Sequence, residues 1–480
     1  MAEEHKHKQV KHRPVLRKIS LLTTIILILA SLLVMIRLIG VNLIPFKYLF
    51  AGGVILAIID LIFLAVSLLR RKHAWKIINI VLALILSVGF IFASIVVKKS
   101  GDSIEKIFQF KEINTTYYVL VNKNSDYNGM MDLNDKKVGL MVTASDKVKE
   151  RLVEYSPEYV TYTSIGELVY SMENDNEGII ISKNYYEYLN EEDENLLMNL
   201  KKIHEFDVII SSSEVKKQAV ESSIDTNNSF VVYLSGVDAS NTLSDVNILI
   251  VVNPDTHKIL LVNTPRDYYV QIAGTTGLKE KLTHGGFYGI NTQMKTLSEL
   301  YNINIDSYIR VNYGAVTTVV DDIGGIDIYS DKDFVTSHSP RTHLNVGNNY
   351  LNGAQALAFA QERYAYATGD RHRGQNQEAV ITAIIKKVST NKTLLLRYNV
   401  ILEDLNPYVT TNIDYKDVQA MIKKQIDDMP TWTVESISVN GSDSQNYTAS
   451  YPRQLTYVMV PDQATVDSAR SRIMEVMREK

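Results

Sequence analysis

The sequence of 480 residues contains no cysteine. Disulfide bonds and thiolate metal sites are therefore excluded, and the stability of the folded domains must come from core packing. Internal repeats and low-complexity tracts are also absent from the sequence. Apolar residues make up 46% of the chain and charged residues 22%, which is close to globular averages, so sizeable cores can be buried.

Basic residues are outnumbered by acidic ones beyond residue 99. Residues 1–99 hold 14 Lys and Arg and three acidic residues, a net charge of +11, so the remainder of the chain has a net charge of −15. An acidic region of this kind does not favour broad nucleic-acid binding, because that binding depends largely on positive charge. We therefore expect no nucleic acid among the partners.

Long apolar runs occur near the N-terminus. Three of them, at about 19–36, 48–69 and 77–97, are long enough to cross roughly 30 Å of hydrocarbon as helices. The basic tail 1–18 and the basic segment 70–76 predict a cytoplasmic N-terminus by the positive-inside rule. Three crossings within 19–97 then place the rest of the chain outside the cell, as expected for a multi-pass protein of the cell membrane.

Asp60 lies near the middle of the second apolar run. An ionisable group at that depth costs about 2.5–3.5 kcal/mol on insertion scales. It indicates either a function or a hydrogen-bonded contact inside the helix bundle, with Asn79 as a candidate partner. We favour the bundle contact.

Two α/β domains are predicted after the apolar runs. In residues 103–210, strand-like runs alternate with helical stretches, which indicates a small extracellular accessory α/β domain. We find no nucleophile, metal cluster or Gly-rich phosphate loop in it, which favours a binding role. The polar segment 211–229 is typical of a linker. Residues 230–480 again alternate strands and helices, with one helix expected at 377–389.

Two carboxylates flank a short turn of the second domain. Asp238 directly follows a predicted strand and Asp245 directly precedes the next one. Hard cations such as Mg²⁺ bind one or two carboxylates together with phosphate oxygens of a substrate. Asp is also common in turns for reasons of capping, so the pair alone supports either interpretation.

Cationic side chains follow a later strand. Thr264-Pro265-Arg266-Asp267 comes directly after it, where Arg266 can project over the end of the sheet. Lys281 and His284 follow within a short distance. Lys281 can add a second cation to the same edge, and we expect His284 to be an ordinary surface histidine.

Three arginines lie within eleven residues of an otherwise acidic domain, at Arg363, Arg371 and Arg373. Guanidinium groups bind phosphate in a bidentate manner and stay charged, so this cluster indicates a phosphate site. It ends at Gln377, near which a helix is expected to begin. A solvated surface is the alternative for an arginine cluster.

Together, carboxylates for a metal and arginines for phosphate oxygens indicate phosphoryl transfer, in which positioning and electrostatics supply most of the catalysis. The sequence shows no competing Ser-His-Asp motif. It also shows no Walker loop or kinase signature, which argues against a nucleotide substrate.

These motifs, in this order behind a membrane anchor, resemble the LytR-CpsA-Psr (LCP) family. The three-span anchor and the additional domain resemble its capsule-associated CpsA-like branch. The resemblance implies an LCP-type α/β domain with a mixed sheet flanked by helices, an apolar tunnel for a polyprenyl chain and a charged mouth for its pyrophosphate. It is carried by residues 233–253, 260–289, 311–329 and 351–385.

The resemblance also implies an activity, which is the transfer of a capsular or other exopolysaccharide glycan from an undecaprenyl pyrophosphate carrier to peptidoglycan. Capsule-assembly proteins are further expected partners. Mg²⁺ or Mn²⁺ would be held by Asp238 and Asp245, and Asp245 is the candidate base for the acceptor hydroxyl. The residues implied to bind pyrophosphate are Arg266, Lys281, Arg363, Arg373 and Gln377, supported by Asp370 and Arg371; the catalytic set would be Asp238, Asp245, Arg363 and Arg373.

The chain departs from the family pattern at two positions. Leu243 stands where the family usually has the Arg of Arg-Ser-Asp, and Gln361 stands where it usually has the first Arg of Arg-x-Arg. Losing one such contact can reduce a rate by about 10²–10³-fold. A non-catalytic receptor or regulator of lipid-linked glycan is therefore the alternative to an active transferase. Transcriptional control conflicts with the expected outside location and the acidity.

Overall fold

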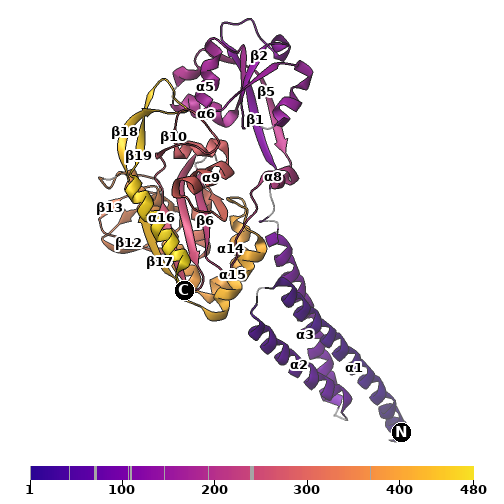
Figure 1. The fold of residues 1–480 in the computed structure, drawn as a ribbon. Coiled ribbons are helices and arrows are strands. Elements are labelled where there is room, and N and C mark those ends of the chain that lie inside the picture. The colour runs from indigo at the N-terminus through magenta and orange to yellow at the C-terminus, as the bar shows by residue number, and fades with distance from the viewer. Residues whose placement is uncertain are drawn as a thin grey trace. The chain divides into compact units, whose positions relative to one another are not determined.

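The computed structural model describes residues 2–42, 44–69, 73–105, 108, 111–144, 146–192, 194–237, 243–367 and 369–480. The chain divides into two compact units, whose elements are labelled in Figure 1. The first unit comprises residues 1–107, 391–403 and 415–430. The second comprises residues 108–390, 404–414 and 431–480.

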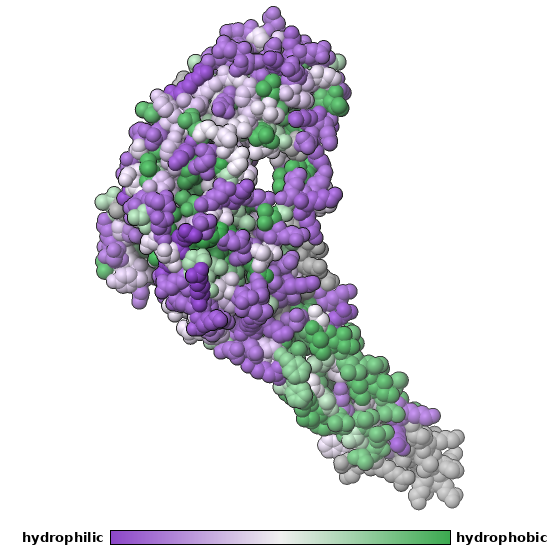
Figure 2. Space-filling view, in the orientation of Figure 1, coloured by the Kyte–Doolittle hydropathy of each residue, from purple (hydrophilic) through white to green (hydrophobic). Residues whose placement is uncertain are grey.

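The first unit is built on three long helices, α1 (Ala2–Val41), α2 (Phe46–Leu68) and α3 (His73–Glu105). Each contains a stretch long and apolar enough to cross a membrane, at Val15–Val41, Phe46–Leu68 and His73–Lys98. Figure 2 shows these helices as a predominantly hydrophobic surface. The three predicted apolar helices are thus confirmed.

Polar contacts join the three helices at two levels. Ser31 donates a hydrogen bond of 2.6 Å to Asp60. The amide of Asn79 donates instead to Ser20 and Thr24 of α1, at 3.1 and 3.2 Å. The prediction that Asn79 is the partner of Asp60 is therefore wrong. The residues of α1 that contact Asn79 precede Ser31 by two to three helical turns, or roughly 10–16 Å at 1.5 Å per residue.

The first unit also contains α13 (Lys392–Leu396), the start of α14 (Tyr398–Leu405) and α15 (Tyr415–Asp428). One of these helices, α15, contacts the end of α1 and the start of α2. Lys47 forms an ion pair of 2.6 Å with Asp427 of α15. Gln419 donates a 2.8 Å hydrogen bond to the carbonyl of Val41.

The N-terminal part of the second unit is a small α/β domain. Its five strands pair in the order β3-β2-β4-β1-β5, with parallel and antiparallel neighbours. Apolar side chains cover both faces of this sheet. The strands are β1 (Ile113–Asn122), β2 (Lys137–Met141), β3 (Glu158–Tyr162), β4 (Gly178–Ser182) and β5 (Leu200–Ile210), and the helices are α4 (Asp146–Arg151), α5 (Ile165–Tyr170), α6 (Lys183–Glu192), α7 (Glu194–Leu197) and α8 (Ser212–Gln218).

The rest of the second unit is built on a six-stranded sheet in the order β16-β11-β6-β7-β8-β17. The pairs β11–β6 and β8–β17 are parallel, and the other neighbours are antiparallel. The predicted α/β class with a mixed sheet is confirmed. The strands are β6 (Phe230–Val237), β7 (Ser244–Asn253), β8 (Lys258–Asn263), β11 (Ser307–Val311), β16 (Val409–Thr411) and β17 (Thr433–Ser438).

Helices cover both faces of this sheet. On one face, α9 (Ile290–Tyr301) and α16 (Gln463–Arg478) enclose the main core, which contains the fully buried rings of Tyr233, Tyr268 and Tyr301. On the other face, α12 (Asp370–Thr390) packs over a smaller apolar cluster. The sequence predicts that α12 begins near Gln377. This prediction is wrong, because the helix begins two turns earlier. The helix begins at Asp370, so the arginines of this segment lie on its first turns.

Short elements connect the larger ones around the edge of the sheet. They comprise four two-stranded ladders, two helices and one 3-10 helix. The ladders are β9 (Tyr269–Val270) with β10 (Glu280–Lys281), β12 (Ile326–Ser330) with β15 (Gly347–Leu351), β13 (Phe334–Val335) with β14 (His343–Leu344), and β18 (Gly441–Tyr447) with β19 (Leu455–Pro461); the helices are η5 (Leu282–Tyr288), α10 (Tyr313–Asp322) and α11 (Gly353–Ala360).

The approach of α11 to α10 provides a test of the packing. A Cβ at Gly353 would lie 2.2 Å from the carbonyl oxygen of Thr317, which no backbone can accommodate without moving. We expect Gly353→Ala to lower the free energy of unfolding by about 1–3 kcal/mol, measured by thermal or urea unfolding of the full chain in detergent. Gly129→Ala is the control, because a Cβ there has no heavy atom within 4 Å. Equal stability of the two variants would contradict the packing.

Candidate functional site

One edge of the six-stranded sheet gathers four strand ends. Strands β6, β8, β11 and β17 run in the same direction, because β6 and β8 are both antiparallel to β7 and each has a further parallel neighbour. Their carboxyl ends therefore meet at one edge, and the loops that follow can build a common site, as in other α/β sheets. We call this edge the mouth. It contains the start of β7, the residues after β8 and β11, and the first turns of α12.

An alternating chain of opposite charges crosses the mouth. The guanidinium of Arg266 is 2.6 Å from a carboxylate oxygen of Asp245 and 3.9 Å from one of Asp267. The ammonium of Lys281 is 3.5 Å from the other oxygen of Asp267. All four side chains are between 14% and 26% exposed. Partial burial strengthens these pairs relative to surface ion pairs, and the cations stay accessible to a ligand.

A β-bulge directs the side chain of Asp245 into this series of charges. The register of β6 and β7 shifts between Gly236 and Val237, so an extra residue of β7 stands opposite β6. Below it, the hydroxyl of Ser244 is fixed by hydrogen bonds with Ser235 and Tyr233, at 2.7 and 3.1 Å. Bulges commonly re-aim a side chain next to a site. The second predicted carboxylate, Asp238, lies outside the described residues.

The start of α12 adds a further ion pair to the charged residues of the mouth. Arg373 forms a 2.6 Å ion pair with Asp370, three residues earlier on the helix. The next residue, Gly374, lies against the end of β8, because a Cβ there would be 2.0 Å from the amide of Asn263. This close approach brings Arg373 to the strand that leads into Arg266. The half-buried Gln377 follows one turn later, on the face of the helix that also carries Arg373.

The other two arginines of the cluster occupy different positions. Arg363 is exposed in the α11–α12 connection and contacts its neighbour Tyr364, whose hydroxyl accepts a 2.7 Å hydrogen bond. Arg371 points to β18, where it donates to the carbonyl of Gly441 at 3.0 Å and contacts Asp443 at 3.3 Å. Residues two apart on a helix face opposite sides, so Arg371 and Arg373 cannot both face one phosphate.

A buried carboxylate, which the sequence did not single out, shapes the α11–α12 connection. Glu362 is 1% exposed and accepts hydrogen bonds from the backbone N–H groups of Tyr364 and Ala365 at 2.6 and 3.0 Å, and from that of Ser337. Burial raises the pKa of Glu362, but these hydrogen bonds outweigh burial and lower it. Glu362 therefore fixes the backbone beside Arg363. The one signal for Glu362 in the sequence is that it directly precedes the candidate phosphate ligand Arg363.

His284 lies at the joint between the accessory domain and the mouth. It is 4% exposed, so the prediction of a surface histidine is wrong. Its Nδ1 is 2.7 Å from Glu280, and its Nε2 is 2.8 Å from the hydroxyl of Tyr188 on α6 of the accessory domain. The sequence cannot show this, because Tyr188 lies 96 residues away.

The joint bears directly on the mouth. Lys281 and Thr283 flank the start of η5, within four residues of both Glu280 and His284. Lys281 pairs with Asp267, and the hydroxyl of Thr283 donates to Asp245 at 3.4 Å. The joint therefore positions two groups that contact the mouth carboxylates.

The available metal donors at the mouth are carboxylate oxygens. Among the residues that the structure describes, no group of three or more His, Cys, Asp and Glu gathers in a way that could hold a metal ion. Asp245 and Asp267 offer hard oxygen ligands, but these oxygens are already in contact with Arg266, Lys281 and Thr283. A cation there would have few protein ligands and would need further oxygens from a ligand, which suits Mg²⁺.

Comparison with known proteins identifies the family. The model of the LytR_cpsA_psr family matches residues 197–466, more than half of the chain. The chain belongs to this family. The match begins just before β5, so most of the accessory domain lies outside the matched region.

Curated relatives in the same family are transferases. The chain is 34% identical over 186 residues to the polyisoprenyl-teichoic acid–peptidoglycan teichoic acid transferase TagU of Bacillus cereus, covering 38% of this chain and 60% of the relative. It is 30% identical over 225 residues to TagU of Bacillus anthracis, covering 47% of this chain and 70% of that protein.

Two solved structures are also similar to part of this chain. Bacillus subtilis TagV is 26% identical, with a TM-score of 0.45, over 53% of this chain and 99% of the TagV chain. TagT bound to LI-WTA is 25% identical, with a TM-score of 0.45, over 54% of this chain and 97% of the TagT chain.

The buried joint predicts a dependence of stability on pH. Burial opposes ionisation of Glu280, but the charge of His284 and the hydrogen bonds from His284, Ser450 and Lys281 outweigh burial and lower the pKa of Glu280 below its ordinary value of 4.5. The stabilisation is therefore present above pH 4.5 and is lost as the pH falls below it.

We expect Glu280→Gln to destabilise the full chain at pH 7 by about 1–3 kcal/mol, because it leaves buried donors poorly satisfied. Its stability should also fall less steeply than that of the wild type between pH 4.5 and 3. Thermal unfolding in detergent across this range measures both effects. Glu299→Gln, at a carboxylate that is 57% exposed on α9, is the control. Parallel curves for Glu280→Gln and the wild type would contradict the assignment.

Proposed function

We propose that this protein transfers a glycan from a polyprenyl pyrophosphate carrier to peptidoglycan. The supporting observation is the mouth, where cations from two separate segments converge on one edge of the sheet. The acceptor hydroxyl would attack the phosphorus that bears the glycan, the bond from that phosphorus to the prenyl phosphate would break, and Asp245 would accept the proton. The curated TagU relatives, which are named as transferases between a polyisoprenyl-linked polymer and peptidoglycan, support the same reaction class.

The charge arrangement suits a pyrophosphate. Arg266 and Lys281 are held by acidic neighbours, and Arg373 is held by Asp370. A pyrophosphate can replace these carboxylates as the partner of the cations, with bidentate contacts to guanidinium groups. Because the cations are already oriented, binding requires little reorganisation, which is the condition for electrostatic catalysis.

The apolar layer under α12 suits a prenyl chain. Only three residues of this cluster are buried, and its other apolar members remain partly exposed although they lie between the sheet and the helix or at their margins. Close-packed cores do not leave such surface, and a prenyl chain entering from the mouth would cover it. The buried members are Ile248, Ile259 and Leu261, and the partly exposed ones are Leu234, Val246, Ile250, Val252, Ile381, Ile385, Trp432 and Val434.

The first departure from the family pattern has a packing explanation. Leu243 packs against the apolar cluster of the accessory domain, as Phe287 and Tyr288 of η5 also do. A guanidinium in its place would be buried against apolar side chains at a high cost in desolvation. In this chain, therefore, position 243 contributes to the joint between the domains. We propose that Arg266, Lys281 and Arg373 carry the phosphate contacts without it.

The proposal also covers the kind of glycan and the metal ion. We propose a capsular or other exopolysaccharide, because the three membrane helices and the accessory domain resemble the CpsA-like branch, and we propose capsule-assembly proteins as further partners. Mg²⁺ is the proposed ion, held by Asp245 and by Asp238. It would neutralise the phosphate charge that develops when the bond to the prenyl phosphate breaks.

A receptor that binds lipid-linked glycan without transferring it is the second candidate. The observation that favours it is the position of Arg371, which contacts β18 and not the phosphate-facing side of α12. Together with Leu243 and Gln361, this leaves fewer guanidinium groups at the mouth than the family pattern provides. A receptor would require binding but no turnover.

The proposed site predicts a large effect of single substitutions on turnover. We expect Arg373→Ala and Asp245→Asn each to lower the rate of glycan transfer by about 10²–10³-fold, because each removes a charge that acts on the reacting phosphates. The assay incubates the full chain in nanodiscs with a prenyl pyrophosphate-linked glycan, Mg²⁺ and peptidoglycan. Arg470→Ala, at an exposed arginine of α16, is the control. Equal rates in all four proteins would refute the site, and binding without turnover in the wild type would favour the receptor.

We also propose that the N-terminus is cytoplasmic and that both α/β domains lie outside the cell. The basic flanks of the apolar helices support this orientation. The contacts of Lys47 and Val41 with α15 support it further, because they put the α1–α2 connection on the same side of the helices as α15. With three crossings, the end of α3 reaches that side as well.

Because the chain has no cysteine, single cysteines can report this orientation directly. We expect a membrane-impermeant maleimide to label Asn124→Cys, at an exposed position between β1 and β2, in intact cells. His73→Cys, at the exposed start of α3, should be labelled only after the membrane is permeabilised. The opposite pattern would reverse the orientation, and the cysteine-free wild type provides the background.

A further inference from the structure

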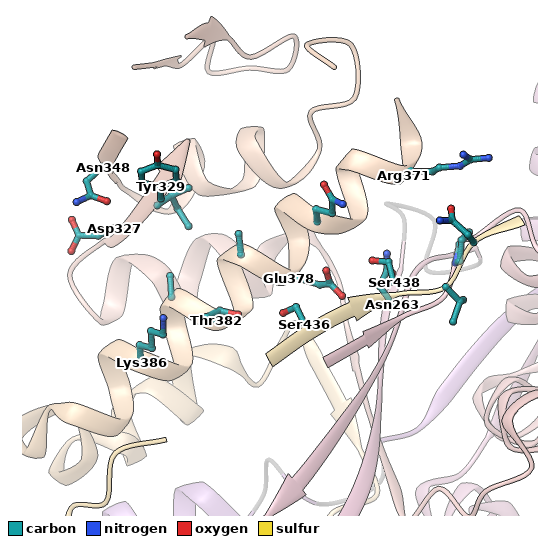
Figure 3. A pocket seen from close by; sticks show the side chains of 17 residues that line it. Asn263, Asp327, Tyr329, Asn348, Arg371, Glu378, Thr382, Lys386, Ser436 and Ser438 are labelled. Atoms are coloured by element: carbon teal, nitrogen blue, oxygen red, sulfur yellow. The ribbon is translucent and has the colours of Figure 1, made fainter. Parts of the chain in front are cut away.

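A second hollow lies beside the mouth, bounded by α12, the end of β17 and the β12–β15 ladder. It has a volume of about 810 Å³, which is within the roughly 300–1,000 Å³ typical of small-molecule sites. Twelve of the 17 residues that line it are polar or charged, and Figure 3 shows those of α12, β17 and β12 around it. We call it the side pocket. The lining residues that matter here are Asn263, Tyr329, Arg371, Glu378, Lys386 and Ser438.

Glu378 is the unexpected member of this lining. It projects from α12 toward Ser438 and Asn263 (Figure 3) and is only 4% exposed. Its Oε1 is fully buried and lacks a hydrogen-bond partner. Burial, which hydrogen bonds with Ser438 and the backbone of Asn263 only partly offset, raises the pKa of Glu378 to about 8. A buried, unsatisfied polar atom is costly and rare, so a ligand that satisfies it would remove a penalty.

The two ends of the side pocket indicate where a ligand would lie. One end is next to the mouth. It contains Pro265, which directly precedes Arg266, and Arg371, which lies on the first turn of α12. The other end contains Lys386 and Tyr329, whose ring is 68% exposed. An exposed aromatic ring among hydroxyl, amide and carboxyl groups is chemistry suited to a pyranose, which offers an apolar ring face and several hydroxyl groups.

From this geometry we propose that the side pocket binds a sugar ring of the transferase's glycan substrates, with Glu378 as hydrogen-bonding partner of a ring hydroxyl and Tyr329 as the surface on which the ring lies. The proposal rests on the proposed function, since it takes the mouth beside the pocket as the phosphate site. We assign the prenyl chain to the apolar layer between α12 and the sheet and not to this pocket, because Arg371, Glu378 and Lys386 place charged or ionisable groups along the pocket.

The sugar can come from either of two substrates, the lipid-linked donor or the peptidoglycan acceptor. Both offer hydroxylated pyranose rings, and the pocket adjoins the place where the two must meet. Binding to separate probes distinguishes the sources. The donor probe is a farnesyl pyrophosphate-linked disaccharide of N-acetylglucosamine, and the acceptor probe is a soluble disaccharide muropeptide.

The experiment measures the affinity of each probe for the full chain in nanodiscs. We expect Glu378→Leu to weaken at least one probe by about tenfold or more, because it removes a buried hydrogen-bonding partner. Glu378→Gln, which keeps a neutral hydrogen-bonding group of the same shape, should retain most of the affinity. Leu also removes the buried unsatisfied oxygen, so the fold should tolerate it, and thermal unfolding of both variants verifies this.

Two comparisons separate this proposal from the proposed function. Arg373→Ala should weaken only the donor probe, through its pyrophosphate, and should leave muropeptide binding unchanged. If the wild type transfers no glycan but loses muropeptide affinity with Glu378→Leu, the pocket is supported while the transferase proposal fails. If folded Glu378→Leu and Tyr329→Ala both bind the two probes as tightly as the wild type does, the sugar site is refuted.

Discussion

Cations that converge to bind a phosphate repel one another until the phosphate arrives, and the mouth depends on how that repulsion is balanced. The chain interleaves acids with bases, so that Asp245, Arg266, Asp267 and Lys281 form one alternating series. Each acid holds its neighbouring cation in place. A pyrophosphate can then exchange with the carboxylates, and the net acidity of the domain is compatible with a locally cationic site.

The same series explains why the accessory domain matters. Lys281 and Thr283 lie at the start of η5, and η5 is fixed to the accessory domain by the hydrogen bond between His284 and Tyr188. Leu243, beside the bulge that aims Asp245, packs against the same domain. Supporting contacts therefore reach both ends of the charged series from a region that lies mostly outside the family match. The accessory domain is thus a structural part of the site.

The sequence predicted the helices and strands better than the contacts between distant side chains. Apolar periodicity is a local property, so the three apolar helices and the α/β alternation could be recognised from it. The start of α12 was missed because the polar run from Asp370 to Gln377 has no apolar stripe, and its close approach to β8 at Gly374 is a tertiary contact that no local pattern shows. Likewise, the burial of His284 depends on Tyr188, which no local pattern indicates. Motifs identified the charged residues, whereas their pairing followed from the strand register.

The position of each arginine on α12 finally decides what the cluster can do. Because the helix begins at Asp370, Arg373 and Gln377 share one face, and Arg371 and Glu378 both line the side pocket. In an extended loop, all three arginines of the cluster could close on one phosphate, as the sequence suggested. On the helix, Arg371 and Arg373 are divided between two hollows, and Arg363 stays exposed in the connection before it. A transferase has to hold a phosphate and a sugar side by side, and this division of one helix between a cationic mouth and a polar pocket meets that requirement with a single rigid element.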